Sequence, residues 1–338
     1  MVAGKSLLLC LFAFAAWGQT SEKVFYFAHL DTPQSMQQVT NMMRAVSDIR
    51  DLMPDAAKRS LTVKGTADQI AAAAWLTAEM DKPGGATGTR DFPFNDPKAP
   101  LMQVVYLSHV DNPQDLQEIF STVRSVIGIQ RCYPMNQQKA IVMRGTAEQV
   151  KAADWLLAAL DRPAGAQPAG AAAREYRLAD ARPDYPLPDE DRNARGGLVV
   201  RVAAPAHIDT PQVLQEIMVV TVGMTDMQRC FPVFSRRVLV MLGTDDQIAL
   251  ADWLLQQFDG PAGQGTKEYK MGGARGQIAQ VAYVNGTPQS LHATASAILT
   301  ETKIARVFAY EPQGAVAMRG TADQLARAQQ VIQSKQGK

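Results

Sequence analysis

The protein has 338 residues, of which 46% are hydrophobic and 7% aromatic, and its formal net charge is +1. A chain of this length can bury a substantial core and form two or three ordinary domains. The near-zero net charge gives no electrostatic footprint for nucleic acid or anionic lipid, and the low aromatic content disfavours a base-stacking surface. We therefore do not expect nucleic acid as a partner.

Residues 1–18 are predicted to be a secretory signal peptide. Lys5 precedes an apolar run at 7–17, and the small residue Gly18 follows it. The run is too short to span a bilayer, but it has the length of the apolar region of a signal peptide. A lipoprotein signal is the less favoured alternative, because Cys10 lies inside the run instead of after it. We expect an exported protein, periplasmic or secreted, with no integral membrane segment after cleavage.

Two short motifs recur four times along the chain. The first is "HLDTPQ", which weakens to "VNGTPQ" in the fourth copy, and the second is "KGTADQI" with its variants. In every copy the glycine of the second motif follows the proline of the first by 32 residues, whereas the spacing between copies varies. A fixed internal length with variable spacing predicts separate domains joined by linkers. We predict four domains, called repeats 1 to 4, at 20–83, 101–163, 198–261 and 277–335, with a flexible linker at 164–197.

Each repeat is predicted to fold as strand, helix, strand, strand, helix. In repeat 2, "QVVYLSH" is rich in β-branched and aromatic residues, and Asn112 and Pro113 are residue types preferred at a helix start. The third strand alternates, so that Ile141 and Met143 face one side. The fold class is therefore α+β, a tandem array of four small βαββα domains. Because a unit of about 60 residues buries only about 60% of its extended-chain surface, we expect packing between copies or between chains.

The glycine–threonine turn before the last helix of each repeat is predicted to be a helix cap. Each threonine is followed three residues later by glutamine, which is the spacing of a capping box. A phosphate-binding loop would need further glycines and a lysine in the turn. The predicted pairs are Thr66 with Gln69, Thr146 with Gln149, Thr244 with Gln247, and Thr321 with Gln324.

A small aromatic motif recurs in the Gly-, Ala- and Pro-rich linkers as "RDFPF", "REYRL" and "KEYKM". We expect it to add a strand ahead of the following repeat, with Phe92, Tyr176 and Tyr269 packed inward. A peptide-like docking segment is the alternative interpretation.

Three histidines recur at one repeat position, two residues before an aspartate. They are His29, His109 and His207, and the aspartates are Asp31, Asp111 and Asp209. Equivalent positions in separate domains need not converge, and no further ligand with metal-like spacing lies nearby. We expect each histidine to orient the turn before the helix, with a backbone group or the aspartate as its partner. A metal site or a His–Asp pair is the alternative.

The cysteines, tryptophans and arginines also recur once per repeat. Cys132 and Cys230 share a position that is held by leucine and valine in the other copies, so we expect free buried thiols, with pairing between chains as the alternative. We expect tryptophan packing against the adjacent strand or copy, with ligand stacking as the alternative, at Trp75, Trp155 and Trp253. We expect a solvated strand face, with a charged row as the alternative, at Arg131, Arg229 and Arg306.

No repeat carries an additional cluster of polar residues. An enzyme would concentrate its nucleophile, base and orienting group at one place. The sequence has no nucleophile elbow, zinc spacing, dinucleotide fingerprint or Walker motif. We therefore predict that the protein is not an enzyme, with no catalytic, cofactor-binding or metal-binding residues and no cofactor.

A strand, a helix opened by "TPQ", two strands, a "[VM]xGTxxQ" turn and a helix closing on "LDRP" resemble the short repeated N-terminal domains of bacterial secretins. The resemblance covers all four copies, and the "RGT" turn and "LDRP" are specific only in combination. Secretins are the outer-membrane channel proteins of type II and III secretion and of type IV pili. The resemblance implies KH-like βαββα domains that stack as periplasmic rings and contact other components of a machine.

One departure from the secretin pattern bears on function. Secretins continue into a long C-terminal segment that builds the channel, whereas here the fourth copy runs to Lys338. We therefore expect a non-enzymatic interaction or scaffold protein that is not itself the pore, with envelope proteins as partners and self-association as a further expectation. Binding of cell-wall glycan or an anionic polymer is the alternative. RNA binding is not expected, because KH domains use a GxxG loop between helices, and here a single glycine lies between strand and helix.

Overall fold

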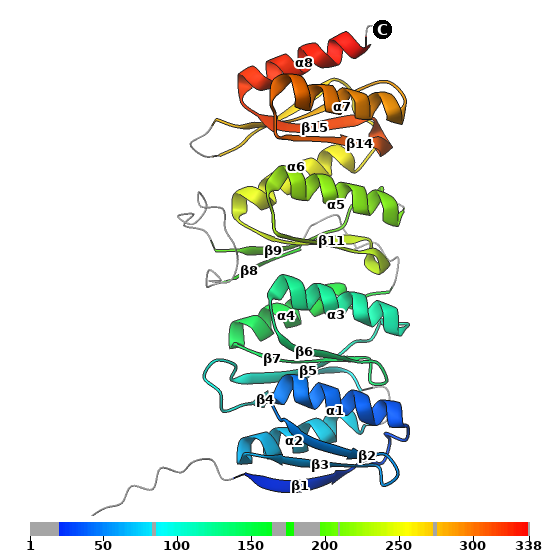
Figure 1. Ribbon diagram of the computed structural model, residues 1–338, viewed down its shortest axis with the longest axis vertical. Coiled ribbons are helices and arrows are strands. Elements are labelled where there is room, and N and C mark those ends of the chain that lie inside the picture. The colour runs from blue at the N-terminus through cyan, green and yellow to red at the C-terminus, as the bar shows by residue number, and fades with distance from the viewer. Residues whose placement is uncertain are drawn as a thin grey trace, which may run out of the picture.

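The computed structural model describes residues 20–82, 86–163, 174–178, 197–208, 210–272 and 276–336. Within these ranges the chain forms eight α-helices and four antiparallel β-sheets. Figure 1 shows the sheets one above another along the long axis, with the helix pairs of repeats 1 to 3 between successive sheets and α7 and α8 at one end. The expected signal peptide at 1–18 lies outside the described residues, and the boundaries of the four domains stay a prediction.

The order of elements predicted for a repeat is confirmed four times, and an added strand precedes repeats 2, 3 and 4. Repeat 1 consists of β1 (Ser21–Tyr26), α1 (Pro33–Ser47), β2 (Asp51–Asp55), β3 (Ser60–Gly65) and α2 (Ala67–Met80). Repeat 2 consists of β5 (Leu101–Tyr106), α3 (Pro113–Ile127), β6 (Arg131–Met135), β7 (Ala140–Gly145) and α4 (Ala147–Leu160). Repeat 3 consists of β9 (Val199–Ala203), α5 (Pro211–Thr225), β10 (Arg229–Val233), β11 (Val238–Gly243) and α6 (Asp245–Phe258). Repeat 4 consists of β13 (Ile278–Tyr283), α7 (Pro288–Thr302), β14 (Arg306–Tyr310), β15 (Ala315–Gly320) and α8 (Ala322–Gln336). The added strands are β4 (Gly88–Pro93), β8 (Arg174–Arg177) and β12 (Thr266–Lys270).

Each sheet is built around the third strand of its repeat. In repeat 2 the order is β4-β5-β7-β6, so the added strand β4 extends the edge formed by β5. The sheet of repeat 1 has the order β1-β3-β2, with no added strand among the described residues. The predicted added strands are thus confirmed. Within the linker predicted at 164–197, the aromatic motif forms β8, which pairs with β9; most of the other linker residues lie outside the described part of the chain, and their flexibility stays a prediction.

Local sequence sets both helix starts of a repeat. Asn112 accepts a hydrogen bond from the amide of Asp115, and Pro113 occupies the first helical position. The predicted capping boxes at the second helices are confirmed by paired hydrogen bonds: in repeat 2 the Gln149 amide donates to the Thr146 hydroxyl, and the Thr146 amide donates to the Gln149 side chain. The same pairs of bonds occur in repeats 1, 3 and 4.

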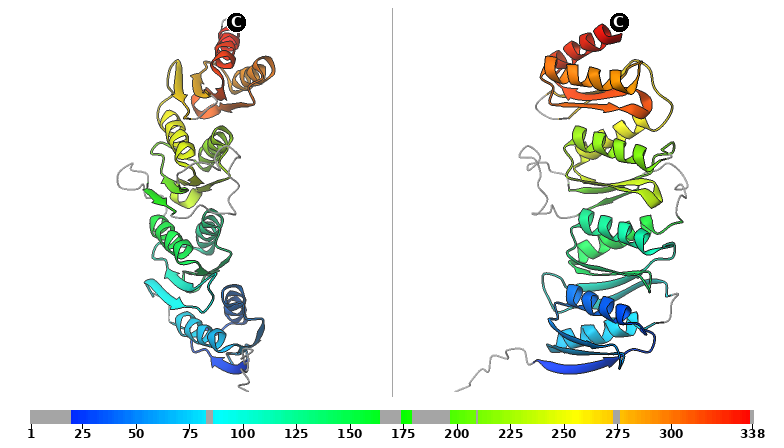
Figure 2. Two further views of the ribbon diagram at one scale, coloured as in Figure 1. Left: turned by 90° about the vertical axis from the view of Figure 1, so that its left-hand side faces the viewer. Right: turned by 45° about the vertical axis from the view of Figure 1, so that its right-hand side comes forward.

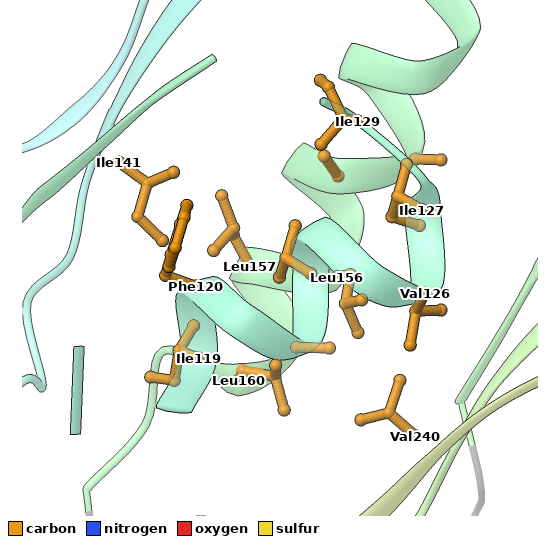
Figure 3. Close-up of a cluster of buried hydrophobic side chains, with 14 of the residues drawn as sticks. Ile119, Phe120, Val126, Ile127, Ile129, Ile141, Leu156, Leu157, Leu160 and Val240 are labelled. Carbon is orange, nitrogen blue, oxygen red and sulfur yellow. The ribbon is translucent and has the colours of Figure 1, made fainter. Parts of the chain in front are cut away.

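The two faces of each inner sheet pack on different helices, which joins the repeats into one stack. Ile141 and Met143 of β7 belong to a core cluster with α3 and α4 of their own repeat. Their neighbour Val142 points the other way, into a cluster with α1 and α2 of repeat 1. Figure 3 shows the next boundary, where Val240 of repeat 3 lies across from Val126 and the helices of repeat 2. The views in Figure 2 show the same alternation of sheet and helix pair along the chain.

Candidate interaction surfaces

The aspartate that closes repeats 1 to 3 ties the last helix back to the first turn. The Asp81 carboxylate accepts hydrogen bonds from the backbone amides of Ala28 and His29, at 2.7 Å each. The His29 ring nitrogen Nδ1 lies 2.7 Å from the carbonyl oxygen of Asp81. Asp161 and Asp259 make equivalent amide contacts in repeats 2 and 3. His29 and His109 therefore contact a backbone carbonyl group through the ring, as predicted, whereas the His207 ring lies 3.4 Å from the Asp259 carboxylate.

Each histidine contacts the closing aspartate of its repeat. Asp31 and Asp111 are exposed, and Asp209 lies outside the described residues. The described part of the chain contains no group of three His, Cys, Asp or Glu side chains that could hold a metal. The closing motifs "DKP", "DRP" and "DGP" recur at a fixed distance from the glycine, and this recurrence is the sequence signal for the contact.

The tryptophans stack on the aromatic residues of the added strands, across the boundary to the next repeat. Trp75 lies 5.2 Å from Phe92 between ring centroids, in a stacked arrangement. The centroid distances are 5.6 Å for Trp155 with Tyr176 and for Trp253 with Tyr269. Both the predicted packing of the tryptophans and the inward position of the linker aromatics are confirmed, and each pair fixes an added strand to the helix below it.

Arginines on the second and third strands bind the end of the first helix of the preceding repeat. At the boundary of repeats 1 and 2, Asp48 pairs with Arg131 at 3.1 Å and with the buried Arg144. Asp48 is the C-cap of α1 and has left-handed backbone angles, with φ 57°. This capping geometry presents the carboxylate to the next sheet. We call this arrangement the Asp–Arg clasp.

The same clasp joins repeats 3 and 4. Asp226, the C-cap of α5 with φ 59°, pairs with Arg306 of β14 and with Arg319 of β15. The expectation that Arg131 and Arg306 lie on a solvated strand face is therefore wrong. Sheet stacking, which is not encoded in the local pattern, brings these guanidinium groups over a helix end.

The boundary of repeats 2 and 3 replaces the clasp with other polar contacts. The C-cap of α3 is Gly128, and Leu242 holds the position of Arg144. Arg229 instead donates to the carbonyl oxygen of Val126 at 3.3 Å, so its prediction as a solvated residue is also wrong. Glu118 of α3 accepts hydrogen bonds from the backbone amides at 234 and 235.

Each inner boundary has a second polar contact. A side chain on the turn between the second and third strands donates to a backbone carbonyl at the end of the last helix of the preceding repeat. Gln138 donates to the carbonyl oxygen of Met80 at 2.7 Å, and Gln313 donates to that of Phe258 at 2.7 Å. In repeat 3 the equivalent residue is Arg236, which is fully buried. Arg236 donates to the carbonyl oxygen of Leu160 at 2.8 Å and pairs with Asp115 at 2.9 Å.

The two cysteines are free and buried, as predicted. Burial raises the pKa of each thiol to about 12, so neither is a reactive thiolate at neutral pH. Within the described ranges, no helix has both the length and the apolar character needed to span a membrane.

Among the described residues, nothing packs against the two ends of the stack in the way that neighbouring repeats pack at the inner boundaries. On the sheet of repeat 1, the side facing away from α1 and α2 carries Val24, Tyr26 and Met53, with 41%, 70% and 59% of their surface exposed. The equivalent residues of repeat 2, Val104 and Tyr106, are buried against the helices of repeat 1. We call this side of β1, β2 and β3 the sheet end.

The opposite end is formed by α7 and α8 and is here called the helix end. On α8, exposed polar residues occupy positions that are buried in α2. Gln330 stands where the other repeats have tryptophan, and Lys335 stands where α2 has the buried Met80. The C-cap of α7 is the exposed Lys303, at the position of the clasp aspartates.

The sequence matches no family model and no curated protein. Among solved structures, the N-terminal domain of the secretin XcpQ from Pseudomonas aeruginosa aligns with 43% of this chain and 63% of that chain, at 11% identity and a TM-score of 0.19. The ETEC pilotin–secretin complex AspS–GspD aligns with 93% of this chain and 55% of that chain, at 9% identity and a TM-score of 0.17. An aspartate kinase from Synechocystis, at 12% identity, also has a TM-score of 0.17, over 95% of this chain and 54% of that chain.

The chain covers less than two thirds of the length of each of these solved structures. TM-scores this low carry no argument about function, and the aspartate kinase scores as well as the secretin complex. The secretin interpretation therefore rests on the recurring motifs and on the order of elements within each repeat.

Proposed function

We propose that the protein is a non-enzymatic interaction or scaffold protein of the cell envelope, periplasmic or secreted, that works with a secretion or pilus machine. The proposal is supported by the contacts of the recurring residues, which are structural in every repeat where they occur. The tryptophans and the clasp arginines hold successive repeats together, and the closing aspartates fix the two ends of one repeat to each other. A stack held in this way presents extended, ordered surfaces to other proteins.

The absence of a collected reactive site supports a binding role. The conspicuous titratable residues of the described chain lie at separate boundaries along the stack, for example Asp48 at the first and Arg236 at the second. Acid–base or nucleophilic catalysis needs such groups within hydrogen-bond reach of one substrate.

No specific observation favours the alternative of glycan or anionic-polymer binding. That alternative depended on rows of tryptophan and arginine side chains. Each of the three tryptophans already stacks on an aromatic ring, and Arg131, Arg229 and Arg306 each contact the preceding repeat.

Site-specific photocrosslinking in cells tests the proposed function. A photoreactive amino acid would replace the exposed residues Tyr26, Phe234 and Leu299 in turn, and the captured proteins would be identified by mass spectrometry. A matched control places the same group at Met143, which is fully buried and should capture nothing. Reproducible capture of an envelope protein at an exposed position is expected. Recovery of no envelope protein, with a purified chain that stays monomeric, would refute the proposal.

A further inference from the structure

We propose that the protein associates end to end, with the helix end of one copy docking on the sheet end of the next. The inference rests on the proposed interaction role and names one partner, a second copy of this chain. Each inner boundary of the stack is already a contact of this kind, in which a helix pair packs under a sheet. The sheet end offers the same side of a sheet, and the helix end offers the same side of a helix pair.

The charges at the two ends complement each other at the positions of the clasp. The inner clasp places a C-cap aspartate, Asp226, against the first residue of the next second strand, Arg306. The helix end has Lys303 at the aspartate position, and the sheet end has Asp51 at the arginine position. If the two ends docked with the geometry of an inner boundary, Lys303 of one copy would meet Asp51 of the next. The positive charge would then lie on the helix and the negative charge on the strand, the reverse of the inner clasp.

A second pair of charges follows the same geometry. Arg319 donates to the carbonyl oxygen of Met224 across the boundary of repeats 3 and 4. The residue equivalent to Arg319 at the sheet end is the exposed Lys64, and the residue equivalent to Met224 at the helix end is the exposed Glu301. Lys64 would lie near Lys303, and the exposed carboxylate of Glu301, two residues before Lys303, offers it a partner, whereas the inner contact is with a backbone carbonyl oxygen.

The apolar residues of the sheet end also find counterparts. In the inner boundary, the ring of Phe308 packs against Gly223 of α5, so closely that an added Cβ would lie 2.1 Å from it. The equivalent residues at the two ends are Met53, which is 59% exposed, and Thr300, which is exposed on α7. Thr300 is larger than Gly223, and it is matched with the unbranched Met53 in place of the Phe308 ring. The charges at the two ends are what fits a second copy.

Charge reversal measured by sedimentation velocity tests this contact. The purified protein should self-associate with increasing concentration and less so at high salt, because the new pairs are exposed. Asp51→Lys and Lys303→Asp should each weaken association about tenfold. Mixing the two variants, or combining both changes in one chain, should restore it. Asp111→Lys makes the same charge change at an exposed site away from both ends and should have no effect.

A cysteine crosslink locates the contact. A Met53→Cys variant mixed with a Thr300→Cys variant should give a disulfide-linked heterodimer, whereas either variant alone should not. The native cysteines do not interfere, because both are buried. A matched control replaces Thr300→Cys with Val219→Cys, at an exposed position on α5, and should give no crosslink.

Three results would overturn the proposal: a chain that stays monomeric at low salt and high concentration, a closed dimer that the end variants leave unchanged, or single variants that are not rescued by mixing. These outcomes are separate from a failure of the proposed function. A monomeric chain that still captures an envelope protein at Tyr26 would contradict end-to-end association alone.

Discussion

Trp155 packs on Tyr176 with 5.6 Å between ring centroids in a tilted arrangement, although Tyr176 lies on the strand added ahead of the next repeat. Trp155 lies on α4 of repeat 2, and Tyr176 lies on β8, the strand added to the sheet of repeat 3. The contact shows how a short strand outside the repeat can hold two repeats in one stack.

Trp155→Leu should therefore destabilise the protein by about 1–2 kcal/mol, since it removes an aromatic pair and part of a packed side chain. The measurement is urea unfolding, together with hydrogen exchange of β8, whose amides should lose protection. Tyr26→Leu is the matched control, because Tyr26 is 70% exposed, and it should change the free energy of unfolding by less than about 0.5 kcal/mol. Equal effects of both changes would contradict the role of the stack.

Asp48→Asn should lower stability at neutral pH and have little effect in acid. Burial raises the pKa of Asp48, but the hydrogen bond from Arg131 and the positive charge of Arg144 outweigh it and hold the pKa below its usual value. A carboxyl with a lowered pKa contributes stability above its unfolded pKa, about 3.9, and loses it as the pH falls through the folded pKa.

Because half of the Asp48 side chain is exposed, the loss at neutral pH should be no more than about 1 kcal/mol. Unfolding by urea at about pH 7 and about pH 3 measures it, and the gap between wild type and variant should narrow at the lower pH. Asp31→Asn removes an exposed carboxylate of the same repeat that lies outside the sheet end, and it serves as the control. A gap that does not depend on pH would argue against the clasp.

Arg236→Met should cost about 3–5 kcal/mol, because it leaves the carboxylate of Asp115 buried without its cation. Adding Asp115→Leu should recover most of the loss, since both charges are then absent from the boundary. Chemical unfolding of the single and double variants measures both effects. Lys58→Met changes the exposed equivalent in repeat 1 and should be nearly neutral. No recovery in the double variant would show that the backbone contacts of Arg236, not the ion pair, dominate.

Gly223→Ala should destabilise the boundary of repeats 3 and 4, although alanine favours helix by about 1 kcal/mol. A Cβ at this position would lie 2.1 Å from the ring of Phe308, and crowding of this kind costs about 1–3 kcal/mol. Ser125→Ala, at the exposed equivalent position of repeat 2, should be neutral or slightly stabilising. Thermal unfolding compares the two, and rescue of Gly223→Ala by Phe308→Leu would confirm the cause.

The elements within a repeat could be predicted because their signals are local. The capping pair Thr146 and Gln149, the alternation of Ile141 and Met143, and the cap at Asn112 each depend on residues a few positions apart. The same local signals recur at one spacing in four copies, and this recurrence supports the predicted order of elements in each repeat.

The contacts between repeats could not be predicted, because they depend on how one sheet sits on another helix pair. Asp48 is an ordinary surface residue in the sequence until stacking brings Arg131 to it. The sequence does contain one signal for the clasp, because the residue that ends the first helix varies together with the arginines of the next repeat. Where the first helix ends in aspartate, the next repeat has arginine on both strands, and where it ends in Gly128, the second arginine is Leu242.

The pairing of a clasp aspartate with two arginines determines which repeats can follow each other with the clasp kept. Repeats 1 and 3 both offer a clasp aspartate, and repeats 2 and 4 both carry the two arginines that receive it. A shortened chain in which repeat 4 followed repeat 1 directly would place Asp48 opposite Arg306 and Arg319 and keep the clasp. A chain in which repeat 4 followed repeat 2 would set those arginines over Gly128, with no acid to meet them. Gene rearrangements that remove the middle two repeats together should therefore be tolerated better than those that remove repeat 3 alone.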